Sequence, residues 1–496
     1  MSSSRNIASG VVWSVIVNIV NALYGFIAAP MLIRYFGRSE YGIIALAQSA
    51  NAYMFLFDMG LSSTNVRFFA KWMAEGNKSK INSLMQTCTA FYGCVGFVNF
   101  IVLLFFYVFS DSIFNVTQEQ DEVLKPMLLV LMATALVNWY TSCWGQIISA
   151  TENVAWMQKR TLLSKVLMII TLVSTIVLKL SIFQYFVATI IAGLILIPLT
   201  YSKLKSLTPY VSILPKFDGK VFKEILPYSL NIFSFGLFQA AFYNSRTFFL
   251  GIQGNVEAVT DFNVMNSIAN MVCMVSSVFI GALLPSTAKV VANGDKTNYY
   301  RVAYQGTRFV SIVLCFCSFG IICISSDLMT IYVGEDYLQL IPWLNLWVLF
   351  LISSHNSAIS SLILAGNDVR AITYSTMIAS IIGLLVTWYS IPYLLAGGPV
   401  LGYAVYTTIQ ILFYYLYYWP IVMKINSLLV FKDSFLPYFI LGVLLWLIIS
   451  VLPHTPNHWI NVLLFGSVFT MIYSLIVYAF LKKEDREFIK STVIRK

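Results

Sequence analysis

The sequence predicts an all-α integral membrane protein with about 14 transmembrane helices, arranged as two pseudo-symmetric six-helix lobes followed by two further helices. The first observation is composition: 59% of the residues are hydrophobic and only 10% are charged, whereas soluble domains carry about 25% charged residues. The second is the length of the apolar runs, which reach the roughly 20 residues that a membrane-spanning helix needs. The runs show no alternation of polar and apolar residues, so they are helices and not barrel strands.

The apolar runs define the expected spans in chain order. Their approximate limits are 9–33, 41–66, 83–108, 126–150, 161–178, 182–201, 225–249, 258–285, 304–324, 341–365, 371–391, 400–422, 435–452 and 459–480. The N-terminal stretch lacks the short apolar core and the small-residue cleavage site of a secretory signal, so we expect the first span to be retained. The loops are short, which leaves no room for a separate soluble domain.

The distribution of basic residues predicts the orientation of these spans. One side of the membrane receives five of the 31 Lys and Arg residues, namely Arg34, Arg38, Lys125, Lys179 and Arg246, and the other side receives the remaining 26. Short loops rich in Lys and Arg stay on the cytoplasmic side. Both termini are therefore expected in the cytoplasm. The same asymmetry explains the net charge of +10 better than nucleic-acid binding does, because the basic residues are spread over many loops.

Two short sequence matches indicate an internal duplication. Ala70 to Lys78 and Ala288 to Lys296 both fit A-K-x-x-A-x-G-x-K at a separation of 218 residues, and "ATENV" at 150–154 corresponds to "AGNDV" at 365–369 at 215 residues. An offset of six helices keeps both halves in the same orientation, as in parallel-repeat transporters. We expect an N-terminal lobe at 1–202, a linker at 203–224, a second lobe at 225–424, and two additional helices with a basic tail at 425–496.

Several classes of chemistry have no support in the sequence. There is no phosphate-binding loop of the type that powers nucleotide-driven pumps, and no nucleophile and base that would suggest an enzyme. The seven cysteines lie within apolar spans and the three histidines are scattered, so no metal site and no cofactor are expected. The chain has the features of a secondary transporter, for which coupling to a proton or sodium gradient is the expected energy source.

Polar residues within the apolar spans mark a candidate transport pathway. Asp58 lies inside the second span, and a carboxylate within a membrane is costly and usually functional. Asn51 and Asn65 flank it at intervals of seven residues, which return to nearly the same helix face. The other candidates for the cavity between the lobes lie on the first, seventh and eighth spans: Asn18, Asn21, Asn231, Asn266 and Asn270. A single Asn in a membrane helix often only bonds to a neighbouring helix, worth about 0.6 kcal/mol.

Three stretches follow one another near the start of the chain: "PMLIRYFGRSEYGIIAL", "FDMGLSSTNVRFFA" and "GNKSKIN". Through a degenerate pattern of glycines, Tyr41, Asp58 and Arg67, they resemble the N-terminal half of the bacterial polysaccharide flippases. The sequence is similar to the Wzx-like transporters of O-antigen or exopolysaccharide, which belong to the multidrug/oligosaccharidyl-lipid/polysaccharide exporter superfamily. Fourteen spans and a basic tail fit along the whole chain.

The resemblance implies a function, a substrate and partners. Such proteins move an undecaprenyl-pyrophosphate-linked oligosaccharide to the periplasmic leaflet of the inner membrane by alternating access. It implies cationic cavity residues that suit a pyrophosphate, for which Arg34, Arg67 and Arg246 are the candidates. Asp58 would then couple to an ion or orient an arginine. The implied partners are the lipid-linked glycan, membrane lipid, a polysaccharide polymerase and a chain-length regulator, with a monomeric chain and no nucleic acid.

Two alternatives remain at this point. One is an ion-coupled drug or small-metabolite antiporter of the same superfamily, against which the two extra helices argue. The other is a membrane component of a polysaccharide assembly complex that transports nothing itself. Rows of polar residues within the membrane spans argue against the last alternative, because a protein that transports nothing does not need them.

Overall fold

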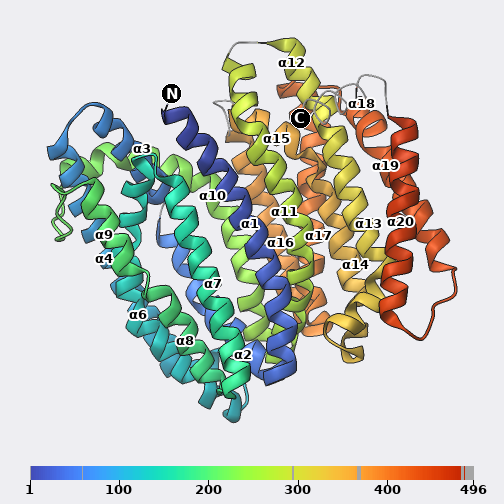
Figure 1. The fold of residues 1–496 in the computed structure, drawn as a ribbon, viewed down its shortest axis with the longest axis horizontal. Helices are drawn as coiled ribbons and strands as arrows, with labels where there is room; N and C mark the ends of the chain where they lie inside the picture. The colour runs from blue at the N-terminus through green and yellow to red at the C-terminus, as the bar shows by residue number, and fades with distance from the viewer. Residues whose placement is uncertain (1, 59, 293–294, 366–369, 482–484, 486–496) are drawn as a thin grey trace. The chain divides into compact units, whose positions relative to one another are not determined.

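The computed structural model describes residues 2–58, 60–292, 295–365, 370–481 and 485. Among these residues the regular structure is helical throughout and no strand occurs. The apolar runs predicted to span the membrane lie mainly on helix in the described part of the chain, so the expected all-α membrane fold is confirmed (Figure 1). Within the described part, 11 helical stretches are long and apolar enough to cross a bilayer, and the protein is a multi-pass membrane protein.

The first half of the chain contains long helices joined by short turns. These elements are α1 (Ser2–Phe36), α2 (Arg38–Ala52), η1 (Tyr53–Asp58), α3 (Leu61–Ala74), α4 (Lys78–Val108), α5 (Ser110–Ile113), α6 (Gln118–Ala150), α7 (Val154–Leu178), α8 (Ile182–Leu194), α9 (Ile197–Leu207), α10 (Gly219–Gln253) and α11 (Val256–Ala292). Thr117 and Gln120 form a capping box at the start of α6, and Ser181 and Gln184 form another at α8, which satisfies backbone N–H groups that a helix start leaves open.

The second half contains more local departures from α-helical geometry. Its elements are α12 (Lys296–Arg301), η2 (Val302–Gly306), α13 (Thr307–Tyr332), η3 (Glu335–Leu340), α14 (Ile341–Leu351), η4 (Ile352–Asn356), α15 (Ser357–Ala365), α16 (Arg370–Leu394), α17 (Gly397–Phe413), η5 (Tyr414–Val422), α18 (Ser427–Leu429), η6 (Val430–Phe435), α19 (Leu436–Ser450) and α20 (His458–Phe480). Here η1, η3 and η4 are 3₁₀-helical, and η2, η5 and η6 are π-helical.

The chain forms two compact units. Unit 1 comprises residues Met1–Val264 and Leu384–Pro399, and unit 2 comprises Met265–Gly383 and Val400–Lys496. These limits differ from those of the expected lobes, since unit 1 extends beyond the linker at 203–224. The internal duplication stays a prediction, because residues 293–294 and 366–369 of its two C-terminal matches lie outside the described part of the chain.

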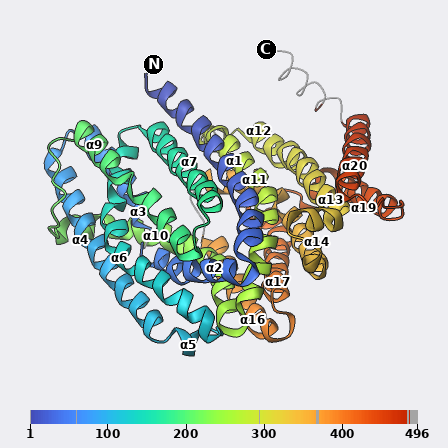
Figure 2. The ribbon, with the colours of Figure 1, turned by 60° about the horizontal axis from the view of Figure 1, so that its bottom comes forward.

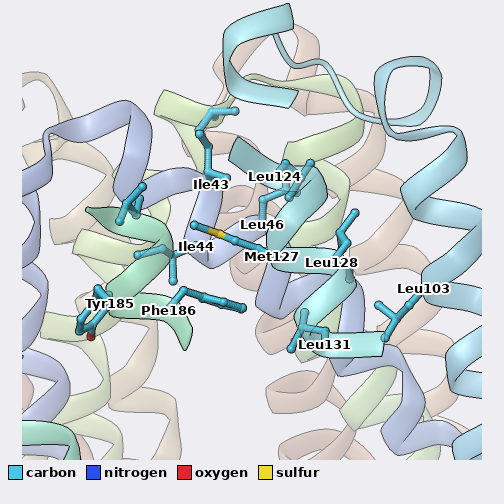
Figure 3. Close-up of a cluster of buried hydrophobic side chains, with 14 of the residues drawn as sticks. Ile43, Ile44, Leu46, Leu103, Leu124, Met127, Leu128, Leu131, Tyr185 and Phe186 are labelled. Atoms are coloured by element: carbon cyan, nitrogen blue, oxygen red, sulfur yellow. The ribbon is translucent and has the colours of Figure 1, made fainter. Parts of the chain in front are cut away.

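Unit 1 is organised around α4 and α6, which run side by side, and α1 packs on α7 (Figure 2). A cluster of buried apolar side chains from α2, α4, α6 and α8 forms one core of this unit (Figure 3). Ile44 and Leu46 of α2, Met127 and Leu128 of α6, and Phe186 of α8 are each at most 5% exposed. Between membrane helices such contacts stabilise through close van der Waals packing and not through removal of apolar surface from water. This packing holds the first part of the second span in place.

The second expected span, 41–66, is not a continuous helix. It consists of α2, the 3₁₀ segment η1 and α3, with a break between Asp58 and Leu61. Gly60 has a φ of 72°, a left-handed conformation that glycine adopts without the cost that a Cβ imposes. A mid-span 3₁₀ segment often marks a functional position. The sequence-based expectation of an unbroken span is therefore wrong here.

Within unit 1, the segment 203–224 that is predicted as a linker consists of the end of α9, a loop and the start of α10. Residues up to Leu207 belong to α9 and residues from Gly219 belong to α10. Between them, the Ser212 N–H donates to Asn82 Oδ1 at 2.7 Å and Tyr140 Oη donates to the Ile213 carbonyl at 2.8 Å. These bonds fix the loop on α4 and α6.

Candidate functional site

The break in the second span places Asp58 at the start of α3. Its Oδ2 accepts from the backbone N–H of Ser62 at 3.3 Å, and its Oδ1 accepts from Ser62 Oγ at 2.9 Å. Gly60, the N-cap residue, has no side chain to do this. A carboxylate near a helix N-terminus also interacts favourably with the helix dipole. Asp58 therefore has a local structural task in addition to any role in transport.

Asp58 is also part of a closed hydrogen-bond network. Tyr92 Oη of α4 donates to Asp58 Oδ1 at 2.7 Å. Gln146 Nε2 of α6 donates to Tyr92 Oη at 3.0 Å and to Ser62 Oγ at 3.1 Å. Asn65 Nδ2 of α3 in turn donates to Gln146 Oε1 at 2.9 Å. Tyr92 and Asn65 are fully buried and Gln146 is 8% exposed, so the three helices are joined by polar contacts inside an apolar unit.

An open pocket of about 570 Å³ lies beside this network, within unit 1. Asp58, Asn51, Ser62, Ser63, Asn138 and Ser142 contribute its polar lining, and Met54, Trp139, Phe233 and Leu237 contribute apolar surface. Asn51 is oriented by Asn99 of α4, whose Nδ2 donates to Asn51 Oδ1 at 3.0 Å. Ligand pockets are commonly between 300 and 1,000 Å³ with a few placed polar groups. Carboxylate, amide and hydroxyl groups beside an indole ring suit a molecule with many hydroxyl groups and an apolar face.

The candidate arginines lie elsewhere in unit 1 and do not line this pocket. Arg67 of α3 is exposed, and its guanidinium lies 4.1 Å from the ring centre of Tyr228. Arg34, near the end of α1, is also exposed. Arg246 is only 4% exposed, and its guanidinium lies within 5.5 Å of the ring centres of Phe242, Tyr243 and Phe262. Such stacking holds an arginine in place.

The remaining candidate residues are dispersed. Asn18 is exposed and Asn21 half-buried on α1, and neither lines the pocket. Asn266 and Asn270 belong to unit 2, so they are not part of the pocket in unit 1. The side chain of Asn231 lies outside the described part of the structure. The site residues that sequence reasoning missed are Tyr92, Gln146, Asn138 and Ser142; Gln146 carries a signal, being an amide within an apolar span.

A second polar contact joins the other end of α2 to α11. Arg38 Nε donates to Asp261 Oδ1 at 2.9 Å, and Arg38 Nη2 donates to Asp261 Oδ2 at 2.5 Å. Thr260 Oγ1 donates to the Arg38 carbonyl at 2.6 Å. A Cβ on Gly42 would stand 2.2 Å from the Val256 carbonyl oxygen, so α2 and α11 are in backbone contact here. We call Arg38, Gly42, Thr260 and Asp261 the α2–α11 clamp.

Across the residues that the structure describes, no three His, Cys, Asp or Glu side chains are grouped so that they could hold a metal ion.

The fold of the chain is that of known membrane transporters. It matches the structure described as "Lipid II flippase MurJ, inward closed conformation" with a TM-score of 0.72 and 14% identity, over 94% of this chain and 99% of that one. It also matches an inward-facing multidrug resistance transporter of the MATE family and the MOP superfamily, with a TM-score of 0.64 and 13% identity, over 88% and 99% of the two chains. At these identities the likeness is one of fold.

The sequence comparison supplies the family. None of the curated proteins compared with the chain matches it. Residues 7–291 match the family described as "Polysaccharide biosynthesis protein", which is more than half of the chain. Together with the fold, this confirms the resemblance to the Wzx-like flippases that the sequence indicated. The chain belongs to the family of polysaccharide biosynthesis proteins.

Proposed function

We propose that the protein is a flippase and not an enzyme, and that it moves an undecaprenyl-pyrophosphate-linked oligosaccharide from the cytoplasmic to the periplasmic leaflet of a bacterial inner membrane. The observation that carries this proposal is the polar pocket of unit 1, within a chain of the polysaccharide biosynthesis family. The polar side chains that line this pocket are half-buried or exposed, and polar groups at membrane depth are found where they line a cavity or meet a polar partner. A polyhydroxylated substrate would satisfy such groups and account for their presence.

The parts of unit 1 would contribute in different ways. Asn51, Asn138 and Ser142 would bond to sugar hydroxyls, and Trp139 would cover a sugar ring. Arg34 and Arg67 are exposed and would contact the pyrophosphate, because guanidinium groups bind phosphate oxygens in pairs. Arg246 is enclosed by rings and would position α10. Asp58 would respond to the coupling ion, a proton or sodium.

The α2–α11 clamp would serve the alternating-access cycle. A two-contact arginine–carboxylate pair is directional and either forms or breaks as a unit. We propose that it holds the periplasmic ends of α2 and α11 together while the substrate enters from the cytoplasm, and that it opens for release.

Deleting the gene tests the substrate directly. Lipid-linked oligosaccharide is expected to accumulate on the cytoplasmic leaflet, and one surface polymer is expected to disappear, because the undecaprenyl carrier cannot deliver its glycan. The measurement is the leaflet distribution of the lipid-linked glycan in inverted and right-side-out vesicles. Normal surface polymer together with increased sensitivity to cationic dyes would instead support a drug antiporter. Normal leaflet distribution with lost polymer would support a component that does not transport.

Fusions to alkaline phosphatase test the proposed orientation. A fusion after Asn115 or Gly397 is expected to be active, because Asn115 lies in a loop and Gly397 at the first residue of α17, both on the side expected to carry few basic residues. A fusion after Lys80 or Lys216 is expected to be inactive, because both lie on the side with most Lys and Arg. Phosphatase activity per fusion molecule is the measurement. An active Lys216 fusion would contradict the orientation of both halves.

A further inference from the structure

Three helices of unit 2 leave α-helical geometry at one place. The segment η4 is 3₁₀-helical over Ile352–Asn356, and η5 and η6 are π-helical over Tyr414–Val422 and Val430–Phe435. Residues of all three segments line one open pocket of about 340 Å³. π-Helix accounts for well under 1% of residues in proteins and is frequent at functional sites. Two π-helical segments and a 3₁₀ turn around one pocket indicate a binding site.

The wall of this pocket is almost entirely hydrocarbon. Four phenylalanines line it, Phe350, Phe431, Phe435 and Phe439. The His355 ring stacks on Phe435 with ring centres 4.4 Å apart. Its two nitrogens are engaged within the protein, Nε2 with Tyr415 Oη at 2.6 Å and Nδ1 with the Ile352 carbonyl at 3.0 Å. The imidazole therefore offers the pocket a ring face and no nitrogen.

These features select an apolar occupant. A water molecule takes a share of about 30 Å³ and needs two to four polar partners, and apolar cavities stay dry and accept hydrocarbon ligands. The pocket of about 340 Å³ is open, so a hydrocarbon chain from the surrounding bilayer can enter it, and the lining atoms then gain van der Waals contacts. Leu412 and Leu416 next to it on the chain are 50% and 71% exposed, as expected for side chains that meet lipid.

Two exposed basic side chains lie near the pocket. Lys432 follows the lining residue Phe431 and is exposed, as is Lys424, two residues after the end of η5. The neighbouring acid, Asp433, is half-buried, so its side chain is less open to a lipid headgroup than that of Lys432; its backbone carbonyl accepts from Arg308 Nε at 3.4 Å. Arg308 itself is paired with Asp485. Exposed lysines at the end of a membrane helix attract anionic lipid headgroups.

We propose that this pocket binds one acyl chain of an anionic membrane phospholipid, whose headgroup contacts Lys432. A resident phospholipid is favoured over the polyisoprenoid carrier, because all lining residues belong to unit 2 and none belongs to the candidate transport site of unit 1. The proposal is therefore independent of the substrate that unit 1 carries.

Photo-cross-linking tests the proposal. The full-length protein is placed in phosphatidylcholine vesicles that contain phosphatidylglycerol with a diazirine on its acyl chain, and labelled peptides are identified by mass spectrometry. Labelling is expected within residues 349–355 and 431–439. Ile411→Trp, which fills the pocket, is expected to reduce it at least fivefold. The matched control Leu412→Trp, at the exposed neighbouring position, is expected to leave it unchanged.

A second variant separates the headgroup from the pocket. Lys432→Gln is expected to reduce labelling by the phosphatidylglycerol probe about fivefold, the effect of one basic residue near an anionic surface, and to leave labelling by a phosphatidylcholine probe unchanged. Equal labelling by both probes in the unaltered protein would contradict the anionic preference. Unchanged labelling in Ile411→Trp, or in Ile411→Phe if the first variant is not folded, would overturn the pocket. Displacement by equimolar undecaprenyl phosphate would assign the pocket to the carrier and overturn the proposal.

Discussion

Replacing Arg38 by glutamine is expected to open the α2–α11 clamp more than replacing Asp261 by asparagine does. The Asp261 side chain is 7% exposed and the Arg38 side chain is 32% exposed. Removal of the arginine leaves a carboxylate buried without its charged partner, which costs about 1–3 kcal/mol or more. Removal of the aspartate leaves an arginine that reaches water. The expected consequence is a roughly tenfold or larger shift toward open molecules in Arg38→Gln, and a smaller shift in Asp261→Asn.

The shift toward open molecules can be measured as the solvent accessibility of a cysteine introduced at a buried position beside the clamp. Val256 is 1% exposed and lies against Gly42 of α2, so Val256→Cys in a background without the native cysteines reports opening through its rate of modification by a membrane-impermeant maleimide. The double variant Arg38→Gln with Asp261→Asn is expected to react more slowly than Arg38→Gln alone, because neither charge is then left behind. Equal rates in all four proteins would show that the pair does not hold this end closed.

A steric variant provides an independent approach to the same contact. Gly42→Ala would place a methyl group 2.2 Å from the Val256 carbonyl oxygen, which forces α2 away from α11 without a change of charge. It should raise the maleimide rate as Arg38→Gln does. If only the charge variants respond, the clamp acts through its electrostatics and not through helix contact.

Sequence patterns were sufficient for the helices and insufficient for the contacts between them. Apolar runs of about 20 residues predict membrane helices because the bilayer imposes that length. The break at Asp58 was missed, since hydropathy does not record φ, although Gly60 marks the position where a left-handed conformation is available. The pairing of Arg38 with Asp261 joins residues 223 positions apart, and such a contact leaves no periodic signal in a single sequence.

The sequence located part of the candidate site, but the helix spacing used to find it does not match the observed structure. The seven-residue spacing of Asn51, Asp58 and Asn65 predicts one face of a straight helix. The helix is broken between Asp58 and Leu61, yet Asn51 and Asp58 both line the pocket and Asn65 joins the network through Gln146. The 3₁₀ segment and the left-handed turn rotate α3 by an amount that the spacing cannot give. Partners on α4 and α6 could be found only from the packing of those helices.

Asp58→Asn is expected to stop export while most of the protein remains folded. The amide keeps the shape and can still accept from Tyr92 and Ser62 Oγ, but its NH₂ group would face the Ser62 N–H in place of Oδ2. Loss of that cap costs about 0.5–2 kcal/mol of stability, which a folded membrane protein tolerates. The charge is a separate matter: one charge moved across 100 mV is worth about 2.3 kcal/mol. If the transport cycle depends on the Asp58 charge, the equilibrium between its two main conformations would therefore change by roughly fiftyfold in the variant.

The two roles of Asp58 are separated by a matched variant. Ser62→Ala removes the hydroxyl that donates to Asp58 and accepts from Gln146, so it disturbs the same network but keeps the carboxylate and its bond to the Ser62 N–H. Both variants should lower the unfolding temperature by a similar amount. Export of lipid-linked glycan per folded molecule should fall roughly fiftyfold in Asp58→Asn and stay within about threefold of normal in Ser62→Ala, while Asp58→Glu should restore a measurable part. Normal specific export by Asp58→Asn, with the same loss of stability as Ser62→Ala, would reduce Asp58 to a cap on α3, and the coupling role would then have to lie outside this network.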